Sequence, residues 1–215
     1  MRLYFVKTPK PIKLLFKHWF WSFSFKKKAI YLTFDDGPTP EITNWVLQQL
    51  KQYNAKATFF CIGKNVKIHS EIFQKIIEEN HSIGNHTNNH FNGWKKNTTS
   101  YLENFEKAEK NFNKNFIFKT EATKLFRPPY GKLKLSQAKK IRNKGFKIIM
   151  WDVLSADFDT QISKEKCLQN VLNNIENGSI VVFHDSKKAT EKLKYVLPKI
   201  LKYYTERNYK FEKII

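Results

Sequence analysis

Residues 29–38 have the sequence AIYLTFDDGP, an apolar run that ends in two adjacent carboxylates, Asp35 and Asp36. The β-branched and aromatic residues of this run predict a buried strand, and the Gly-Pro pair predicts its end. Adjacent carboxylates repel each other, so burying both at a strand end is unfavourable unless a cation or an arginine compensates them. An Asp-Gly-Pro turn with no further role is the alternative interpretation.

Similar apolar runs recur along the chain and alternate with segments of helical periodicity. Strands are expected at residues 29–34, 57–62, 81–84, 124–127, 146–151, 179–184 and 209–214. Between the first two, Ile42, Val46 and Leu50 recur at the spacing of one helix face. This alternation is typical of parallel strands joined by helices. We therefore predict an α/β fold, an incomplete or distorted (β/α) barrel with about seven parallel strands; an open doubly wound sheet is the alternative.

The chain of 215 residues is long enough for one well-buried domain, and no Pro/Gly/Ser-rich stretch divides it. We predict a domain over residues 29–215, preceded by a basic, aromatic segment, residues 1–28, that packs on it or flanks it. Lys17 and His18 interrupt the apolar run of that segment and no small-residue cleavage site follows, which argues against a signal peptide. The run is also too short to predict a membrane span. These features leave the compartment open, and a cytoplasmic location and association with a membrane surface are both compatible with them.

The charge balance is strongly basic, with 39 Lys and Arg against 19 Asp and Glu, a formal net charge of +20. Such a surface favours anionic partners such as nucleic acid, a lipid headgroup surface or an acidic wall polymer, although a solvated basic surface without a partner explains it equally well. No nucleic-acid-binding motif accompanies the charge, so no specific nucleic-acid partner is predicted. Cys61 and Cys167 have no metal-knuckle or disulfide-framework spacing and are expected as reduced core residues.

Two histidines, His86 and His90, follow the third expected strand in the sequence GNHTNNH. Their i,i+4 spacing predicts two imidazoles on one face of a helical turn, close enough to share a metal ion. Taken alone, such a pair is more often a surface or satisfied pair of histidines. Together with Asp36 they would complete a site of two histidines and one carboxylate, the arrangement of a hydrolytic zinc centre.

Further polar residues follow the later strands. Arg127 leads into Pro128-Pro129-Tyr130, a rigid segment in which the Tyr130 N–H is a free donor held in place. Asp157 lies past the fifth expected strand and His184 closes the sixth. Singly, these residues could be a surface ion pair, a loop cap and a buried hydrogen-bonded side chain. Five strand ends of one orientation that each offer a catalytic-type side chain favour an active site at that rim.

From about Ala29 to the C-terminus, the chain resembles the polysaccharide deacetylases with a NodB homology domain, carbohydrate esterase family four. Five motifs occur in the family's order. The first, which begins at Thr33, implies Asp35 as general base and Asp36 as metal ligand. The second implies His86 and His90 as metal ligands, and Thr87 as a brace of their loop.

The last three motifs imply the remaining roles. Arg127 is expected to hold the catalytic aspartate, and the Tyr130 N–H to help bind the oxyanion. His184 is expected as the catalytic acid, oriented and tuned by Asp157, with Val182 near the acetate methyl. The chain departs from the family pattern where Phe158 replaces the usual Trp and Val182 the usual Leu. Both departures keep an apolar wall, so they concern the substrate groove rather than the chemistry.

The resemblance implies a metal-dependent hydrolase that removes N-acetyl groups from amino sugars in a glycan such as peptidoglycan or a chitin-like oligosaccharide. The expected cofactor is a divalent ion, zinc first and cobalt as an alternative. The expected partners are the glycan substrate and an anionic wall polymer or membrane surface. An amidase of the same fold acting on a small non-sugar amide, and a basic module that binds nucleic acid or membrane, are the alternative functions.

Overall fold

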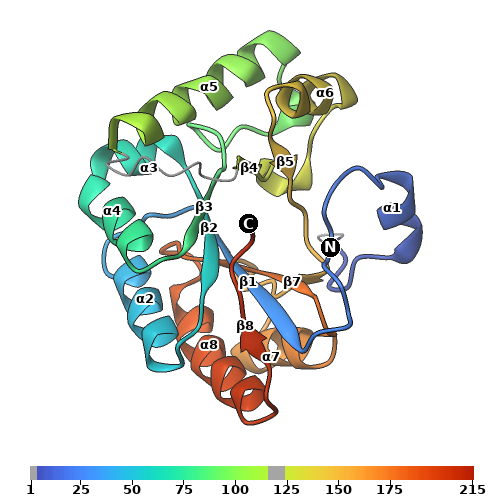
Figure 1. Cartoon of the computed structure of the whole chain (residues 1–215), viewed down its shortest axis with the longest axis vertical. Helices are drawn as coiled ribbons and strands as arrows, with labels where there is room; N and C mark the ends of the chain where they lie inside the picture. Colours follow the sequence, from blue (N-terminus) through green and yellow to red (C-terminus); the bar gives the residue numbers. More distant parts are fainter. Residues whose placement is uncertain (1–3, 116–123) are drawn as a thin grey trace.

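The computed structural model describes residues 4–115 and 124–215, which form one curled sheet with helices outside it (Figure 1). The strands run in the order β5-β4-β3-β2-β1-β7-β6, every pair is parallel, and β8 pairs with β1 off this path. The strands are β1 (Ala29–Asp35), β2 (Ala57–Cys61), β3 (Ser82–Asn85), β4 (Leu125–Phe126), β5 (Lys147–Ile148), β6 (Val153–Leu154), β7 (Ile180–His184) and β8 (Lys210–Phe211). The predicted α/β fold with an incomplete barrel is confirmed.

The strand expected over residues 146–151 is shorter than predicted, and a strand was missed after it. Only Lys147–Ile148 pair as β5, and the chain then crosses Trp151 and Asp152 to β6, which pairs with β7. The apolar run hides this division because Ile149 and Met150 are buried without belonging to a strand. Asp157 consequently follows β6 rather than the end of the fifth strand.

Helices surround the strands on the outside of the curl, while α1 lies apart from this ring (Figure 1). They are α1 (Lys10–Leu15), α2 (Ile42–Gln52), α3 (Gly63–Ile68), α4 (Ser70–Glu78), α5 (Thr98–Asn115), α6 (Leu135–Asn143), α7 (Lys164–Leu172) and α8 (Thr190–Thr205), with the 3₁₀ turns η1 (Gly93–Lys95) and η2 (Pro129–Gly131). Among the described helices, none has both the length and the apolar character that crossing a bilayer requires.

The side chains of β1 alternate between the hydrophobic core and the interior of the curl. Successive side chains of a strand point to opposite faces, so Leu32 and Phe34 face the helices while Thr33 and Asp35 face the interior of the curl. Phe34 stacks on Phe59 and Phe183 of the neighbouring strands, with ring centroids 5.1 and 6.0 Å apart. All of these side chains are buried, so β1 is held rigidly and positions the carboxylates at its end.

The segment before β1 lies across the gap between β5 and β6, the two edges of the curled sheet. The Thr8 N–H donates to the Asp152 carbonyl at 2.9 Å, and the Leu154 N–H donates to the Val6 carbonyl at 2.8 Å. On the other edge, Phe20 exchanges backbone hydrogen bonds with the chain at Ile148 and Met150. Residues 4–28 therefore supply partners to backbone groups that an open sheet would leave unpaired.

Asp152 links this segment to the sheet. Its buried carboxylate accepts hydrogen bonds from Lys7, at 2.8 Å, and from Lys13 and Ser179. Burial alone would raise the pKa of Asp152, but the hydrogen bonds of the two lysines and the serine outweigh it and lower that pKa. The carboxylate is thus ionised at neutral pH and clamps both lysines.

We expect Asp152→Asn to lower the free energy of unfolding by roughly 2 kcal/mol, because it removes charge-assisted hydrogen bonds from a buried acceptor. A group with a lowered folded-state pKa stabilises at neutral pH and loses that effect in acid, so the difference between variant and wild type should shrink as pH falls. Urea unfolding at pH 7 and at a pH about one unit below the ordinary carboxyl pKa of 3.8 measures it. Glu106→Gln is the control, since its ion pair with Lys144 is exposed on both sides and should cost under about 1 kcal/mol. Equal losses in the two variants would contradict the clamp.

Candidate active site

The predicted site residues meet at the carboxyl ends of the strands, where parallel strands place their following loops together. Asp35 ends β1 and His184 ends β7, and the two are direct partners in the register of these neighbouring strands. Arg127 follows β4 and His86 follows β3. One rim therefore carries a carboxylate, a guanidinium and two imidazoles from residues that are far apart in the sequence.

Arg127 organises this rim from inside the curl. Its side chain is fully buried, and Nη1 donates to Asp35 Oδ1 at 2.8 Å and to Thr33 Oγ1 at 2.7 Å. Nε and Nη2 donate to the carbonyls of Ile149 and Met150. The guanidinium thus has fixed partners on β1 and on the segment after β5, and the Asp35 carboxylate is both compensated and aimed.

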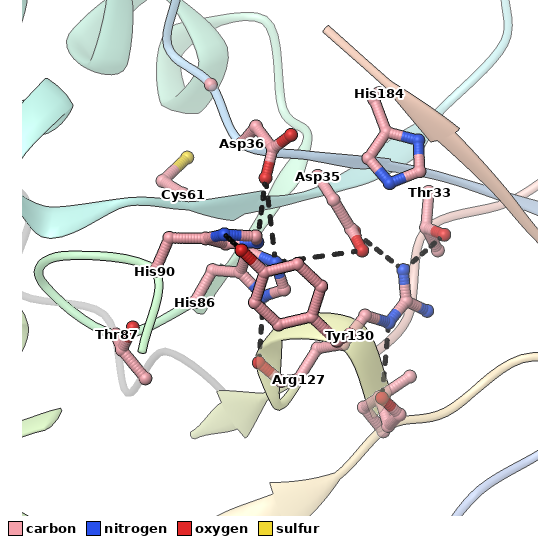
Figure 2. Close-up of polar contacts among 12 residues, drawn as sticks. Thr33, Asp35, Asp36, Cys61, His86, Thr87, His90, Arg127, Tyr130 and His184 are labelled. Carbon is pink, nitrogen blue, oxygen red and sulfur yellow. Dashed lines mark hydrogen bonds and ion pairs between the residues drawn. The ribbon is translucent and has the colours of Figure 1, made fainter. Parts of the chain in front are cut away.

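Three side chains converge in front of Asp35, as Figure 2 shows: Asp36 and the imidazoles of His86 and His90. Asp36 Oδ1 lies 3.3 Å from His90 Nε2 and 3.8 Å from His86 Nε2. One donor atom from each of the three lies within 4.8 Å of the others. Asp36 Oδ1 is buried and has no hydrogen-bond partner among the described residues. A buried carboxylate oxygen without a donor facing two imidazole nitrogens is what a cation site requires.

Hydrogen bonds on the far side of each ring orient the two imidazoles. His86 Nδ1 lies 2.8 Å from the Arg127 carbonyl, which can only accept, so Nδ1 carries the proton and the Nε2 lone pair faces Asp36. His90 Nδ1 lies 3.1 Å from the Tyr130 hydroxyl. Burial, the largest effect, lowers the pKa of both histidines despite the nearby aspartates. Both rings are therefore neutral at pH 7, the form that binds a metal.

The histidines lie on a loop, so the expected helical turn is wrong. After His86 the chain turns through left-handed backbone at Thr87, with φ 60°, and again at His90, with φ 53°. The Thr87 hydroxyl accepts a hydrogen bond from the Phe91 N–H at 3.0 Å and so spans the loop. These polar contacts hold the ring centroids of His86 and His90 5.0 Å apart, which the i,i+4 spacing alone does not do.

Tyr130 lies on η2, also with a left-handed φ of 61°, and its ring packs 4.5 Å from that of His90. The sequence pointed to the backbone N–H of this residue and missed the contact of its hydroxyl with His90. The role of the N–H stays a prediction. The side chain is 60% exposed, so it forms part of the outer wall of the site (Figure 2).

Asp157 and His184 form the second polar pair of the rim. His184 Nδ1 lies 2.7 Å from Asp157 Oδ1, and the His184 N–H donates to Asp157 Oδ2 at 2.8 Å. Burial lowers the pKa of His184, but Asp157, with smaller contributions from Asp36 and Asp35, outweighs burial and raises that pKa to about 10. The imidazole is therefore protonated at neutral pH and its Nε2–H is a proton donor. Phe158 packs edge-on against it, with ring centroids 5.1 Å apart.

Asp185 is a site residue that the sequence reasoning missed. It is fully buried, and its carboxylate accepts hydrogen bonds from the Gly37 N–H at 3.0 Å and from the Thr43 hydroxyl at 2.6 Å. Burial, with a smaller effect from Asp36, raises the pKa of Asp185 to about 8. A Cβ on Gly37 would lie 2.0 Å from this carboxylate, so only glycine fits beside it. Asp185 thus anchors the loop that follows Asp36. Its position directly after His184 is the one feature of the sequence that could have pointed to it.

The structure brings all eight predicted site residues to the same rim, where Asp35 and His184 are neighbours on adjacent strands. The pairs Arg127–Asp35, His90–Asp36, His90–Tyr130 and His184–Asp157 are in direct contact, and His86 lies 4.0 Å from Asp35. Val182, expected near the acetate methyl, is buried two residues before His184 on the same face of β7. The chemical roles assigned to these residues remain predictions.

Comparison with known proteins agrees with this arrangement. The family model described as polysaccharide deacetylase matches residues 24–149, more than half of the chain. This chain belongs to that family. It is 38% identical over 162 residues to a peptidoglycan-N-acetylglucosamine deacetylase of Bacillus cereus, covering 75% of this chain and 58% of that protein. It is 31% identical over 159 residues to a chitooligosaccharide deacetylase of Azorhizobium caulinodans, covering 74% of each.

A solved structure resembles the polysaccharide deacetylase fold of this chain over nearly its whole length. The crystal structure of the Bc1960 peptidoglycan N-acetylglucosamine deacetylase superposes with a TM-score of 0.86 at 32% identity, covering 96% of this chain and 95% of that one. The expected family and the expected half-barrel are thereby confirmed. The chain spans 58% of the length of the Bacillus cereus relative first described.

The residues present in this polysaccharide deacetylase fit a divalent ion. Two neutral imidazoles and one carboxylate supply three donors of the kinds that zinc and its neighbours accept. The buried Oδ1 of Asp36 has no hydrogen-bond partner among the described residues, and a bound cation or a proton would supply one. The fit therefore rests on Asp36, His86 and His90 together.

We expect Asp36→Ala to lower zinc affinity by more than about 100-fold, a larger loss than removal of an outer hydrogen-bond partner causes. Equilibrium dialysis against zinc with metal analysis measures it without any substrate. Asp35→Asn is the matched control. Residue 35 bonds Arg127 and is not one of the three metal-donor residues, so this variant should bind zinc as the wild type does. Equal zinc binding by wild type and Asp36→Ala would remove Asp36 from the metal site.

Proposed function

We propose that this chain is a zinc-dependent deacetylase that hydrolyses N-acetyl groups on amino sugars of a cell-wall-type glycan, with peptidoglycan first and chitin-like oligosaccharides second. One observation carries the proposal: Asp35 and His184 are register partners on neighbouring strands, and the three donor side chains lie immediately beside them. An oriented carboxylate and a protonated imidazole next to a metal site form an apparatus for hydrolysis of an unactivated amide.

The relatives support the substrate class. The Bacillus cereus protein is named for N-acetylglucosamine in peptidoglycan and the Azorhizobium protein for chitooligosaccharides, and both substrates carry N-acetyl groups on a sugar ring. The apolar wall of Val182 and Phe158 beside His184 suits a small methyl group such as that of acetate. Zinc is proposed from the donor set, with cobalt as a working substitute.

An ion held by Asp36, His86 and His90 would act as a Lewis acid that polarises the acetamide carbonyl and acidifies water. Asp35, held in place by the buried Arg127 guanidinium, accepts a proton from the attacking water. The water oxygen bonds to the carbonyl carbon, and the Tyr130 N–H stabilises the negative oxygen, a contact typically worth about 3 to 4 kcal/mol.

His184 completes the reaction on the other side of Asp35. Its protonated imidazole donates a proton to the sugar nitrogen as the C–N bond breaks, which releases acetate and a free amine. Asp157 holds the ring by Nδ1 and so leaves Nε2–H directed away from itself, toward the rim. Base and acid therefore approach the amide from neighbouring strands.

Acetate release tests the proposal directly. We expect release from N-acetylglucosamine oligomers and from purified peptidoglycan, loss of release with a chelator, and recovery on addition of zinc or cobalt. Asp35→Asn should retain zinc but lose turnover by roughly 1,000-fold, the upper range for a positioned general base. With zinc confirmed bound, no release from either glycan would favour the alternative of a small non-sugar amide.

The Asp157–His184 pair predicts a pH dependence. Because a proton donor is lost when pH exceeds its pKa, the alkaline limb of the rate profile should follow His184. Asp157→Asn removes the carboxylate that raises this pKa, so the alkaline limb should move about 1 to 2 pH units lower. Measuring kcat between pH 6 and 11 with zinc saturating tests it, at an ionic strength held constant. An unmoved alkaline limb would show that another group donates the proton.

A further inference from the structure

A hollow of about 670 Å³ adjoins the proposed catalytic site on the side of the loop after β1. Pro38 and Asn65 form its inner wall. The Asn65 amide donates to the backbone carbonyl of Asp36 at 2.8 Å, and Pro38 is two residues from Asp36 in the chain. Asn65 therefore both lines the hollow and supports the backbone of Asp36, the proposed metal ligand. The proposed reaction places nothing in this space.

The opposite wall of the hollow comes from the chain after β7, the strand that ends in His184. Lys187, three residues beyond His184, and Lys194, on the second turn of α8, line it. Both lysine side chains belong to exposed residues. Within residues 4–115 and 124–215, no ion pair includes either of them. Both ammonium groups are therefore open to a ligand in the hollow.

The balance of charge around the hollow is positive. Glu41 is the single acidic residue among those that line it, against Lys187 and Lys194. The first turn of α8 also borders the space at Thr190, and the N-terminal end of a 16-residue helix carries partial positive charge. A low-dielectric wall beside two ammonium groups attracts an anion more strongly than open solvent does. A neutral sugar would not use this feature.

We infer that the hollow is a subsite for a carboxylate of the glycan, borne by a sugar next to the one that loses its acetyl group or by a branch on that sugar. The inference rests on the proposed function, which puts the acetyl group at the rim. It adds the place where a carboxylate of an acidic glycan binds, a group that a neutral chitin-like oligosaccharide lacks. A polymer with one residue held at the rim extends past it, and the hollow lies next to the loop at Asp36 that borders the rim. The same lysines repel the free amine that deacetylation creates, which disfavours rebinding of a processed strand.

The experiment compares KM for two soluble substrates, neutral N-acetylglucosamine oligomers and peptidoglycan fragments with free carboxylates. In Lys187→Gln/Lys194→Gln we expect KM for the acidic fragments to rise roughly five- to tenfold, several times more than KM for the neutral oligomers. Lys188→Gln/Lys202→Gln is the matched control. It removes the same charge from residues that do not line the hollow, one of them paired with Glu206, and should leave the ratio of the two KM values unchanged.

A second variant acts in the opposite direction. Glu41→Gln removes the one carboxylate of the lining and should lower KM for the acidic fragments about two- to threefold. The effects of both variants should diminish in about 0.5 M salt, where charges are screened over a few ångströms. A rise in KM that is equal for neutral and acidic substrates, or equal for the hollow and control variants, would overturn the subsite.

Calorimetric binding of the same fragments separates this inference from the proposed function, because binding needs no turnover. A selective loss of acidic-fragment affinity in Lys187→Gln/Lys194→Gln supports the subsite even where no acetate is released, in which case the proposed function alone fails. Acetate release from both glycans with no selective loss of affinity leaves the proposed function standing and overturns the subsite. All variants change exposed side chains, and their melting temperatures should match that of the wild type.

Discussion

The buried contact between Arg127 and Asp35 is the interaction on which the rest of the rim depends. A fully buried guanidinium is costly to desolvate, and here each of its nitrogens has a partner: the Asp35 carboxylate, the Thr33 hydroxyl and two backbone carbonyls. Those partners lie on or beside different strands, so the same side chain that compensates Asp35 also holds the ends of β1 and the segment after β5 together. The backbone carbonyl of Arg127 then orients His86, which couples the proposed base to the metal site.

The rim concentrates more carboxylates than its own cations balance. Asp35 is matched by Arg127 and Asp157 by protonated His184, whereas Asp36 faces two neutral imidazoles. Asp185 is a further buried carboxyl, but burial raises its pKa to about 8, so at neutral pH it is mostly protonated and adds little charge. The uncompensated Asp36 carboxylate makes the position between Asp36, His86 and His90 attractive to a cation. It also makes protonated His184 more stable than Asp157 alone would.

Much of the fold followed from patterns in the sequence. The runs that became β1, β2 and β7 are long, apolar and bounded by turn residues, as strands buried on both faces are. The division of residues 146–151 was hidden because Ile149 and Met150 are buried beside strands without belonging to one. The helical turn for His86 and His90 failed for a related reason: spacing specifies which residues are near, but side-chain-to-backbone contacts such as Thr87 with Phe91 decide the loop. Asp185 and Asn65 act through backbone groups of the loop at Asp36, and sequence alone does not reveal which backbone group a polar side chain reaches.

The segment that spans the gap between β5 and β6 makes closure of the curled sheet a long-range folding event. Val6, Thr8 and Phe20 have their backbone partners near residues 148–154, so more than 120 residues separate the two sides of each contact. Contacts of such separation carry a large loop-closure cost, so they are expected to form after the more local pairings between neighbouring strands. Closure of the curled sheet therefore couples folding of the segment before β1 to folding of the region around β5 and β6.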